Sequence, residues 1–337
     1  MEDLNGVIMI DPITKKQIVD VPYYECMDRI SNSAIGWFLN QGPAYLHSKL
    51  CGLEEDETSS AMTRGTAIHM FFLQPEEFKK SYVVWTSKKP ASPQQETFCK
   101  ELANSVEIEP NKAILSAYKK AYRTNGKSDQ NLLLEASSLA KELKDYIEYL
   151  RNPERELLSM YQYQMIKTLE QSVNTHKLAK KLLYPTQGEV HHEFHINWEL
   201  HGVPCKSLLD SVHFDFENKI CTLMDIKTTT KINHFEDSIH QYDYTRQLEF
   251  YTLALLWYLE NERREDPTAW HFNWYIIAMD TNGRNNVRVF KFTDDQITIQ
   301  SVKILNAIDE IKWHIENNLW DHSKAYYEGD GAETLNL

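Results

Sequence analysis

Residues 203–216, VPCKSLLDSVHFDF, and residues 219–230, KICTLMDIKTTT, decide the fold of this chain. Both segments are short and rich in β-branched, apolar and aromatic residues, which is typical of β-strands. Only Glu217 and Asn218 separate them, and strands that are joined so closely pair in antiparallel fashion. The sequence therefore predicts a β-hairpin whose turn is centred between Glu217 and Asn218.

Asp210 and Asp225 occupy facing positions in this hairpin, because they lie equally far from the centre of the turn. Facing Cβ atoms in an antiparallel pair are about 4.5–5.5 Å apart, and like charges at that distance repel each other. A bound divalent cation removes the repulsion, and carboxylate oxygens are suitable ligands for Mg²⁺ or Mn²⁺. The pair therefore predicts a metal site.

Lys227 follows Asp225 by two residues, so its side chain projects from the same face of the strand. Two acids and a lysine on one face can bind a metal, polarise a phosphate and activate water. These are the parts of metal-assisted phosphodiester hydrolysis. The alternative interpretation is a surface salt bridge between Asp225 and Lys227 on a solvated strand face.

The segments around the hairpin predict an α/β fold, in which helices flank a mixed central sheet. Further strands are expected over 189–200, 269–280 and 286–292, and helices over 243–264 and 294–318. The first half is rich in helical periodicity, with helices over 31–41 and 61–74 and again from 111 to 183. Residues 86–110 hold three prolines and many polar groups, so they are expected to be a connecting segment.

The change of pattern at Gly188 suggests two regions. Residues 1–187 form a helical N-terminal region that contributes the helix of His69 to the active site. Residues 188–337 form the catalytic core. The two are expected to make one continuous structural domain.

Four further residues are candidates for the same site. Gln247 and Tyr251 share a face of the predicted helix, although a buried glutamine bonded to backbone and a core tyrosine are the structural alternative. His69 lies four residues after a glycine, which leaves room for close approach, but a core histidine whose hydrogen bonds are satisfied is the commoner interpretation. Glu193 lies on the strand that pairs with the strand of Asp210, and is either a further ligand or an exposed acid.

A basic run occupies residues 111–128, which contain five basic residues and no acid. Lys119, Arg123 and Lys127 recur every four residues. A solvated helix face is one interpretation and a DNA-facing strip is the other. Arg64 is a further candidate for phosphate contacts.

Composition excludes several classes of protein. The net charge of −13 argues against nonspecific coating of nucleic acid, and the five cysteines are scattered without a CxxC pair, which argues against a disulfide framework, a zinc ribbon or an Fe–S cluster. The longest apolar runs are about half of what a membrane span needs. The acidic N-terminus lacks the features of a signal peptide. We therefore expect a soluble protein of the cytoplasm, in a bacterial or phage-infected host cell.

Together these residues resemble the PD-(D/E)XK nuclease superfamily, in its RecB/RecE-like branch. The closer resemblance is to PDDEXK-like exonucleases related to RecE (exodeoxyribonuclease VIII), whose core is restriction-endonuclease-like. It covers most of the chain from about residue 28. The segments that resemble successive blocks of that family are ISNSAIGWFLNQGPAYL, GTAIHMFFLQPEEF, GVPCKSLLD, MDIKTT, YDYTRQLEFY and NNLWDHSKAYYEGDGAETLNL.

The resemblance implies a role for each matched position. Asp210 and Asp225, with the backbone carbonyl of Ile226, are implied to be ligands of one or two Mg²⁺ or Mn²⁺ ions. Lys227 is implied to orient or deprotonate the attacking water and to stabilise the pentavalent phosphate. The remaining matched residues complete the metal coordination or brace the active site and the DNA backbone; they are His69 and Glu193 for the metal, and Gln247 and Tyr251 for the bracing.

The resemblance also implies a substrate and partners. The expected activity is hydrolysis of linear double-stranded DNA, in the 5′-to-3′ direction, in phage-type recombination or DNA processing. A single-strand annealing protein and a homo-oligomeric ring are implied as partners. A structure-specific or site-specific endonuclease on the same core is one alternative. A DNA-binding protein without catalysis is another, against which the intact set of Asp210, Asp225 and Lys227 argues.

Overall fold

The computed structural model of the chain describes residues 9–10, 17–18, 23, 28–54, 60–124 and 126–331. The chain forms two compact units, one of Met1–Gly65 with Ser172–Leu337 and one of Thr66–Gln171. Both passages between the units lie inside a helix. The first is within α3 (Ser60–Leu73) and the second is within α9 (Met160–Thr175).

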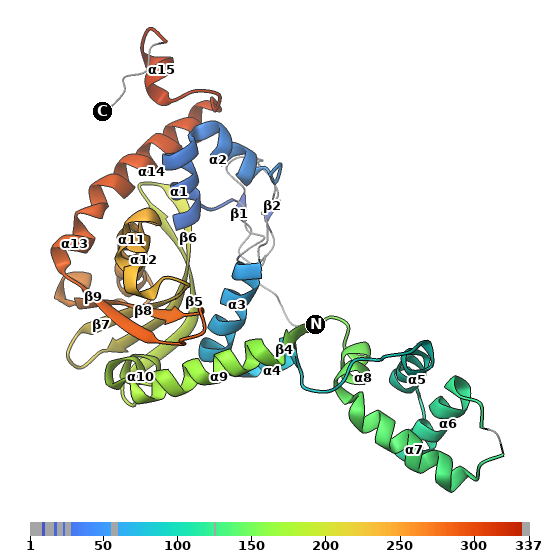
Figure 1. Cartoon of the computed structure of the whole chain (residues 1–337). Coiled ribbons are helices and arrows are strands. Elements are labelled where there is room, and N and C mark those ends of the chain that lie inside the picture. The colour runs from blue at the N-terminus through green and yellow to red at the C-terminus, as the bar shows by residue number, and fades with distance from the viewer. Residues whose placement is uncertain are drawn as a thin grey trace, which may run out of the picture. The chain divides into compact units, whose positions relative to one another are not determined.

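The first unit is built on a five-stranded sheet in the order β5-β6-β7-β8-β9 (Figure 1). Neighbouring strands are antiparallel except β7 and β8, which are parallel. The mixed sheet is the one that the sequence predicts, and each strand begins and ends within two residues of its expected position. The strands are β5 (Glu189–Leu200), β6 (Val203–Asp215), β7 (Ile220–Thr229), β8 (His271–Asp280) and β9 (Val287–Phe292).

The register of the β6–β7 hairpin confirms the predicted pairing, since Ser211 lies opposite Met224. Residues 216–219 form the turn. The carboxylate of Asp215 accepts hydrogen bonds from the backbone nitrogen of Asn218 at 3.0 Å and from its side-chain amide at 2.8 Å. This local bonding is typical of turns that Asp and Asn initiate, and it centres the turn where the sequence places it.

Helices α12 (Tyr244–Asn261) and α14 (Gln300–Asn317) are the long helices of the first unit. Helix α12 lies between β7 and β8 in the chain, as the crossover of a parallel strand pair requires. Its apolar residues, including Phe250 and Leu255, are fully buried in the same core as the inward side chains of the sheet. The predicted helix over 294–318 is divided near Ile299, which separates α13 (Asp294–Thr298) from α14.

Shorter elements complete the first unit. They are β1 (Met9–Ile10) and β2 (Gln17–Ile18), which pair in antiparallel fashion, α1 (Asn32–Gln41), α2 (Pro43–Leu50), α10 (Lys177–Leu183), η1 (Ile232–His234), α11 (Phe235–Gln241), η2 (Pro267–Ala269) and α15 (Lys324–Glu328).

Helix α1 belongs to the core of the sheet rather than to a separate N-terminal region. Ile30, just before the helix, donates its backbone N–H to Pro204 at 2.9 Å and accepts from Lys206 at 3.0 Å. Arg246 of α12 donates to the carbonyl of Asn32 at 2.8 Å. These bonds explain why the compact units divide at Gly65 and Ser172 and not at Gly188, where the change of sequence pattern marks only the start of β5.

The second unit is mainly helical. Its core joins four helices through buried residues such as Phe98, Ala117 and Ala136. A two-stranded parallel sheet of β3 and β4 accompanies them. The elements are α4 (Pro75–Ser81), β3 (Tyr82–Trp85), α5 (Pro93–Ala103), α6 (Pro110–Ala121), α7 (Asp129–Glu142), α8 (Lys144–Arg151) and β4 (Glu156–Ser159).

The expectation that residues 86–110 only connect other elements is wrong, because α5 lies there. Pro93 occupies the first turn of that helix, where the missing N–H of proline costs nothing. Ser92 caps the helix by accepting from the backbone nitrogen of Gln95 at 3.3 Å. The pattern of prolines marks the start of a helix here, and it was taken for a loop.

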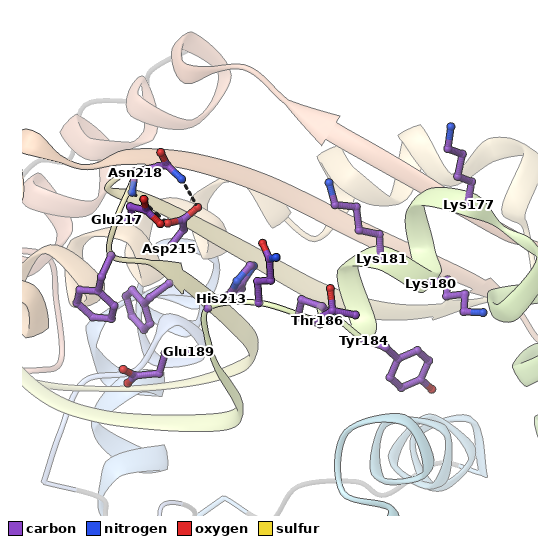
Figure 2. Close-up of a pocket in the computed structure, with 15 residues that line it drawn as sticks. Lys177, Lys180, Lys181, Tyr184, Thr186, Glu189, His213, Asp215, Glu217 and Asn218 are labelled. Carbon is purple, nitrogen blue, oxygen red and sulfur yellow. Dashed lines mark hydrogen bonds between the residues drawn. The ribbon is translucent and has the colours of Figure 1, made fainter.

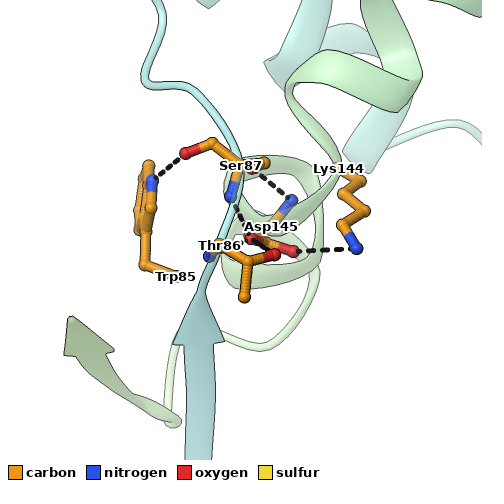
Figure 3. Close-up of polar contacts among 5 residues, drawn as sticks. All are labelled: Trp85, Thr86, Ser87, Lys144 and Asp145. Atoms are coloured by element: carbon orange, nitrogen blue, oxygen red, sulfur yellow. Dashed lines mark hydrogen bonds and ion pairs between the residues drawn. The ribbon is translucent and has the colours of Figure 1, made fainter. Parts of the chain in front are cut away.

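The segment after β3 is held by Asp145, in the first turn of α8 (Figure 3). The carboxylate of Asp145 accepts from the backbone nitrogen and the hydroxyl of Thr86, the latter at 2.8 Å, and from the backbone nitrogen of Ser87 at 2.6 Å. Ser87 in turn accepts from the backbone nitrogen of Asp145 at 3.1 Å. Burial raises the pKa of Asp145, but the hydrogen bonds outweigh that effect and leave its pKa below the usual value.

The helices in the described ranges were compared with what a membrane span requires. None of them is both long enough and apolar enough to cross a bilayer.

Candidate active site

Three carboxylates stand in a row across neighbouring strands of the sheet. The β5–β6 register, in which Phe194 lies opposite Leu209, puts Glu193 opposite Asp210. The β6–β7 register puts Asp210 opposite Asp225. Residues in facing positions project from the same face of a sheet. One carboxylate oxygen of Glu193 and one of Asp210 lie within 4.8 Å of each other.

The backbone departs from regular pairing at this row. Asp210 accepts the backbone N–H of Ile226 with its side-chain Oδ2, at 2.7 Å. Glu193 has a φ of 50°, in the left-handed region. A residue with a Cβ pays roughly 1–2 kcal/mol for that conformation. Strain of this kind in the middle of a strand marks a position where the side chain must be aimed, and such positions cluster at functional sites.

The row is electrostatically unfavourable without a cation. Burial, with the neighbouring charges of Asp210 and Asp225, raises the pKa of Glu193 to about 7. Burial and the charge of Asp210 raise the pKa of Asp225 to about 7 despite the adjacent Lys227. Two acids with pKa values this far above their ordinary range are a sign of a functional site.

Lys227 is the cation of the site. Its Nζ lies 2.6 Å from Oδ2 of Asp225 and 5.0 Å from the ring centroid of Tyr244. Burial lowers the pKa of Lys227, but the carboxylates of Asp225 and Asp210 outweigh burial, so its pKa lies above the usual value. The salt bridge between Asp225 and Lys227 therefore exists, but it is not on a solvated face, because Asp225 is only 2% exposed.

Gln247 and Tyr251 of α12 lie beside the same carboxylate. The amide nitrogen of Gln247 is 3.2 Å from Oδ1 of Asp225 and 3.0 Å from the hydroxyl of Tyr251. Tyr251 is buried, and burial raises its pKa well above the usual value. This chain of hydrogen bonds orients the carboxylate from the side of the helix. The pair belongs to the site and does not only fill the core.

Tyr244 was not identified from the sequence. It lies three residues before Gln247 and seven before Tyr251, so it shares their helix face. That spacing is the signal that could have found it.

The donor set fits a hard divalent cation. Oxygen ligands from Glu193 and Asp210 converge, and Asp225 lies in the next strand of the row. Carboxylate and carbonyl oxygens are the ligands that Mg²⁺ and Mn²⁺ prefer. In Asp225, Oδ2 is buried and meets Lys227 as an ion pair without the geometry of a hydrogen bond.

The remaining predicted residues lie elsewhere in the chain. Arg64 lies on the part of α3 that belongs to the first unit, and His69 lies one turn further along the same helix, in the second unit. In the basic run, Lys119 forms an ion pair with Asp129 and Lys127 one with Glu135. Their charge is thereby partly neutralised. Binding of DNA by Lys119, Arg123 and Lys127 stays a prediction.

The largest cavity described, of about 910 Å³, lies away from the carboxylate row, between α10 and the β6–β7 turn (Figure 2). Lys177 and Lys181 project from α10 to the same side, as residues four apart on a helix do (Figure 2). Glu189, Asp215 and Glu217 also line this cavity. Its wall is therefore of mixed charge.

Comparisons with known proteins agree with this geometry. The family described as "PDDEXK-like domain of unknown function (DUF3799)" matches residues 31–325. A crystal structure from Eubacterium rectale, described as a "putative exonuclease", superposes with a TM-score of 0.50 at 12% identity, over 95% of this chain and 96% of that one. No curated protein matches the chain. The fold is thus restriction-endonuclease-like, and the chain belongs to the PDDEXK-like family, within the PD-(D/E)XK nuclease superfamily.

Proposed function

We propose that this protein is a Mg²⁺- or Mn²⁺-dependent deoxyribonuclease that degrades linear double-stranded DNA from its ends, in the 5′-to-3′ direction. The observation that carries the proposal is the row of Glu193, Asp210 and Asp225 with Lys227 beside it. Membership of the PD-(D/E)XK superfamily supports the nuclease activity, and the resemblance to RecE-like exonucleases supports the preference for ends.

Asp210, Asp225 and the carbonyl of Ile226 would hold the metal, together with Glu193. A divalent ion bound there supplies Lewis acidity to the scissile phosphate and lowers the pKa of a bound water. The pKa values near 7 of Glu193 and Asp225 support this assignment, because such acids gain most from a nearby cation. The left-handed backbone of Glu193 supports it further, since the strain has no other use in the strand.

His69 is proposed as a further ligand. Helix α3 approaches β7 closely at Gly65, where a Cβ would lie 3.3 Å from Oγ1 of Thr228. His69 follows Gly65 by four residues on the same continuous helix, and residues four apart share a face. The face that meets β7 at Gly65 therefore carries the imidazole one turn later.

Lys227 is proposed to act as a cation that stabilises charge on the phosphate. Its raised pKa keeps the ammonium protonated at neutral pH, which favours this role over that of a general base. In the reaction, the oxygen of water forms a bond to phosphorus and one P–O ester bond breaks. One proton of the water ends on the leaving alkoxide and the other is lost to solvent. Gln247 and Tyr251 hold Asp225 in place meanwhile.

Incubation with linear and covalently closed circular duplexes, with Mg²⁺ or with EDTA, tests the proposal. We expect Mg²⁺-dependent loss of linear DNA only, with release from the 5′ end of end-labelled substrates. Equal cutting of circles would instead indicate an endonuclease on the same core.

Asp225→Asn tests the site itself. We expect it to lose nuclease activity and to keep DNA binding, because the amide can no longer hold the metal but leaves the surface intact. Asp309→Asn, an exposed acid on α14 that pairs with His201, is the matched control and should keep full activity. Equal activity of Asp225→Asn and the wild type would refute the catalytic assignment and favour a DNA-binding protein. A homo-oligomeric ring and a single-strand annealing partner stay predictions from the resemblance.

A further inference from the structure

We propose that a cavity beside the carboxylate row binds a phosphate group of the DNA strand that is being cut, through Arg64 and Lys231. The inference rests on the proposed function, since it assigns the substrate's position at that site. The cavity has a volume of about 310 Å³ and lies wholly within the first unit. That is the lower end of the range for ligand sites, with room for a phosphate and part of its sugar.

The lining has the chemistry of an anion site. It holds two cations, one amide and seven residues with a hydroxyl group, and none of these described residues is acidic. In a chain with a net charge of −13, a wall without a carboxylate stands apart from its surroundings. The lining residues are Arg64, Thr228, Thr229, Thr230, Lys231, Phe235, Ser238, Gln241, Tyr242, Tyr244 and Thr281.

Both cations are available to a ligand. Arg64 is half-buried and Lys231 is exposed, and neither forms an ion pair with an acid of the described residues. Many other lysines of the chain are paired, as Lys303 is with Asp243 at 2.6 Å. Arginine and lysine, together with Ser, Thr and Tyr hydroxyls, supply most contacts of proteins to DNA phosphates. An anion in the cavity would supply the counter-charge that the protein does not.

The cavity adjoins the catalytic lysine. Tyr244 forms part of its wall, and the ring of Tyr244 lies 5.0 Å from Nζ of Lys227. Thr228, also in the wall, is the next residue of β7 after Lys227. A phosphate in the cavity would therefore be a near neighbour of the bond being cut and not a distant part of the duplex.

Gly65 explains how Arg64 reaches the cavity. A Cβ at Gly65 would lie 3.3 Å from Oγ1 of Thr228, so the absence of a side chain lets α3 approach β7 at this point. The approach brings the preceding Arg64 to the wall that Thr228 forms. The lysine-lined cavity beside α10 differs, because Glu189, Asp215 and Glu217 in its wall would repel a phosphate.

Salt-dependent DNA binding tests the subsite without requiring cleavage. The full chain with Asp225→Asn is titrated onto a labelled linear duplex in Mg²⁺ at several salt concentrations. Arg64→Gln and Lys231→Gln should each weaken binding by roughly three- to tenfold and lower the slope of log K against log salt by about 0.9, the value for one lost phosphate contact. Arg64→Lys should keep most of the slope. Lys181→Gln removes one charge from α10 and should change neither quantity.

Neutral substitution of single phosphates then locates the contact. A methylphosphonate at one internal position, or a 5′-hydroxyl in place of a 5′-phosphate, should weaken binding of the parent. The same change should cost Arg64→Gln nothing further, because that contact is already lost. The position at which the losses stop adding shows whether the bound group is an internal phosphodiester or a terminal phosphate.

The two proposals fail in different ways. If Arg64→Gln and Lys231→Gln leave affinity and slope equal to those of Lys181→Gln while both variants keep the melting temperature of the parent, the subsite is refuted even where the wild type cuts DNA. If the wild type cuts nothing and the slopes change as expected, the phosphate contact stands and the nuclease proposal falls.

Discussion

Asp225 is held from two sides, since Lys227 neutralises one carboxylate oxygen and Gln247 donates to the other. A carboxylate that is 2% exposed would otherwise take up a proton. Lys227 thus keeps a metal ligand ionised before any metal arrives, in addition to its proposed action on the phosphate. The two roles can be separated, because one affects metal binding and the other affects turnover.

We expect Lys227→Ala to lower the rate of DNA hydrolysis by about 10²- to 10³-fold, the usual loss when a charge that stabilises the transition state is removed. Metal affinity should fall much less, because the oxygen ligands remain. Single-turnover rates and Mn²⁺ titration measure the two effects. Lys219→Ala, which removes a lysine at the start of the same hairpin strand that pairs with Glu265, is the control. An unchanged rate in Lys227→Ala would remove this lysine from the mechanism.

The raised pKa values predict how stability depends on pH. Glu193 and Asp225 have pKa values of about 7 when folded without metal, against about 4 in an unfolded chain. Their contribution to stability is full below pH 4 and is lost as the pH rises through 7. With EDTA, the free energy of unfolding should fall between pH 5 and pH 8, by at most about 1.4 kcal/mol per pH unit for each group.

Urea denaturation at several pH values measures this effect. Glu193→Gln removes one of the two groups and should flatten the dependence, and Mg²⁺ should oppose the loss at high pH. Stability that stays constant or rises over this range in EDTA would contradict the assignment.

Parts of the site could be predicted because they follow from short-range rules. The turn at Glu217-Asn218 fixes the register, and the register brings Asp210 and Asp225 together. The left-handed backbone of Glu193 could not be predicted, since nothing in a single sequence distinguishes a strained glutamate from an ordinary one in a strand. The cavity at Lys231 depends on Gly65, which is far away in the sequence.

At the scale of elements, the bonds of Asp145 replace regular pairing where β3 ends. The backbone N–H groups of Thr86 and Ser87 point to one carboxylate at the start of α8. An element as short as β3, with four residues, gains little from its partner β4 alone. Contacts of this kind, 58 residues apart in the case of Ser87, decide where such a strand ends.

We expect Asp145→Ala to lower the free energy of unfolding of the second unit by about 1–3 kcal/mol, since it leaves buried N–H groups without an acceptor. Hydrogen exchange at Thr86 and Ser87 in the full chain should rise accordingly. Asp129→Asn removes an exposed ion pair with Lys119 and should change stability by less than about 1 kcal/mol. Protection at Thr86 and Ser87 that is unchanged by Asp145→Ala would show that other contacts hold this segment.

Long elements could be predicted and short ones could not. Strands β5 to β9 and helix α12 have strong periodicity, so local sequence determines them. Strands β3 and β4 were missed, and β4 was assigned to the helix that follows it. Their four residues each are too few for a pattern, and their pairing joins segments more than 70 residues apart.

At the scale of the whole molecule, the sequence predicts one domain with a boundary near Gly188, and the chain divides otherwise. Residues 66–171 form a compact unit between two parts of the first unit. Hydrophobic periodicity shows that a helix buries one face, but it does not show which core receives that face. Helix α1 and the helices of the second unit therefore look alike in sequence, although only α1 is bonded to the sheet through Ile30.

Because α3 leaves the first unit as one unbroken helix, the spacing between Gly65 and His69 sets an angle as well as a distance. Each residue of an α-helix rotates the chain by about 100°. One inserted or deleted residue would therefore swing the imidazole more than a quarter of a turn from the face that Gly65 presents to Thr228. Related chains should accordingly differ here in residue type but keep the same length.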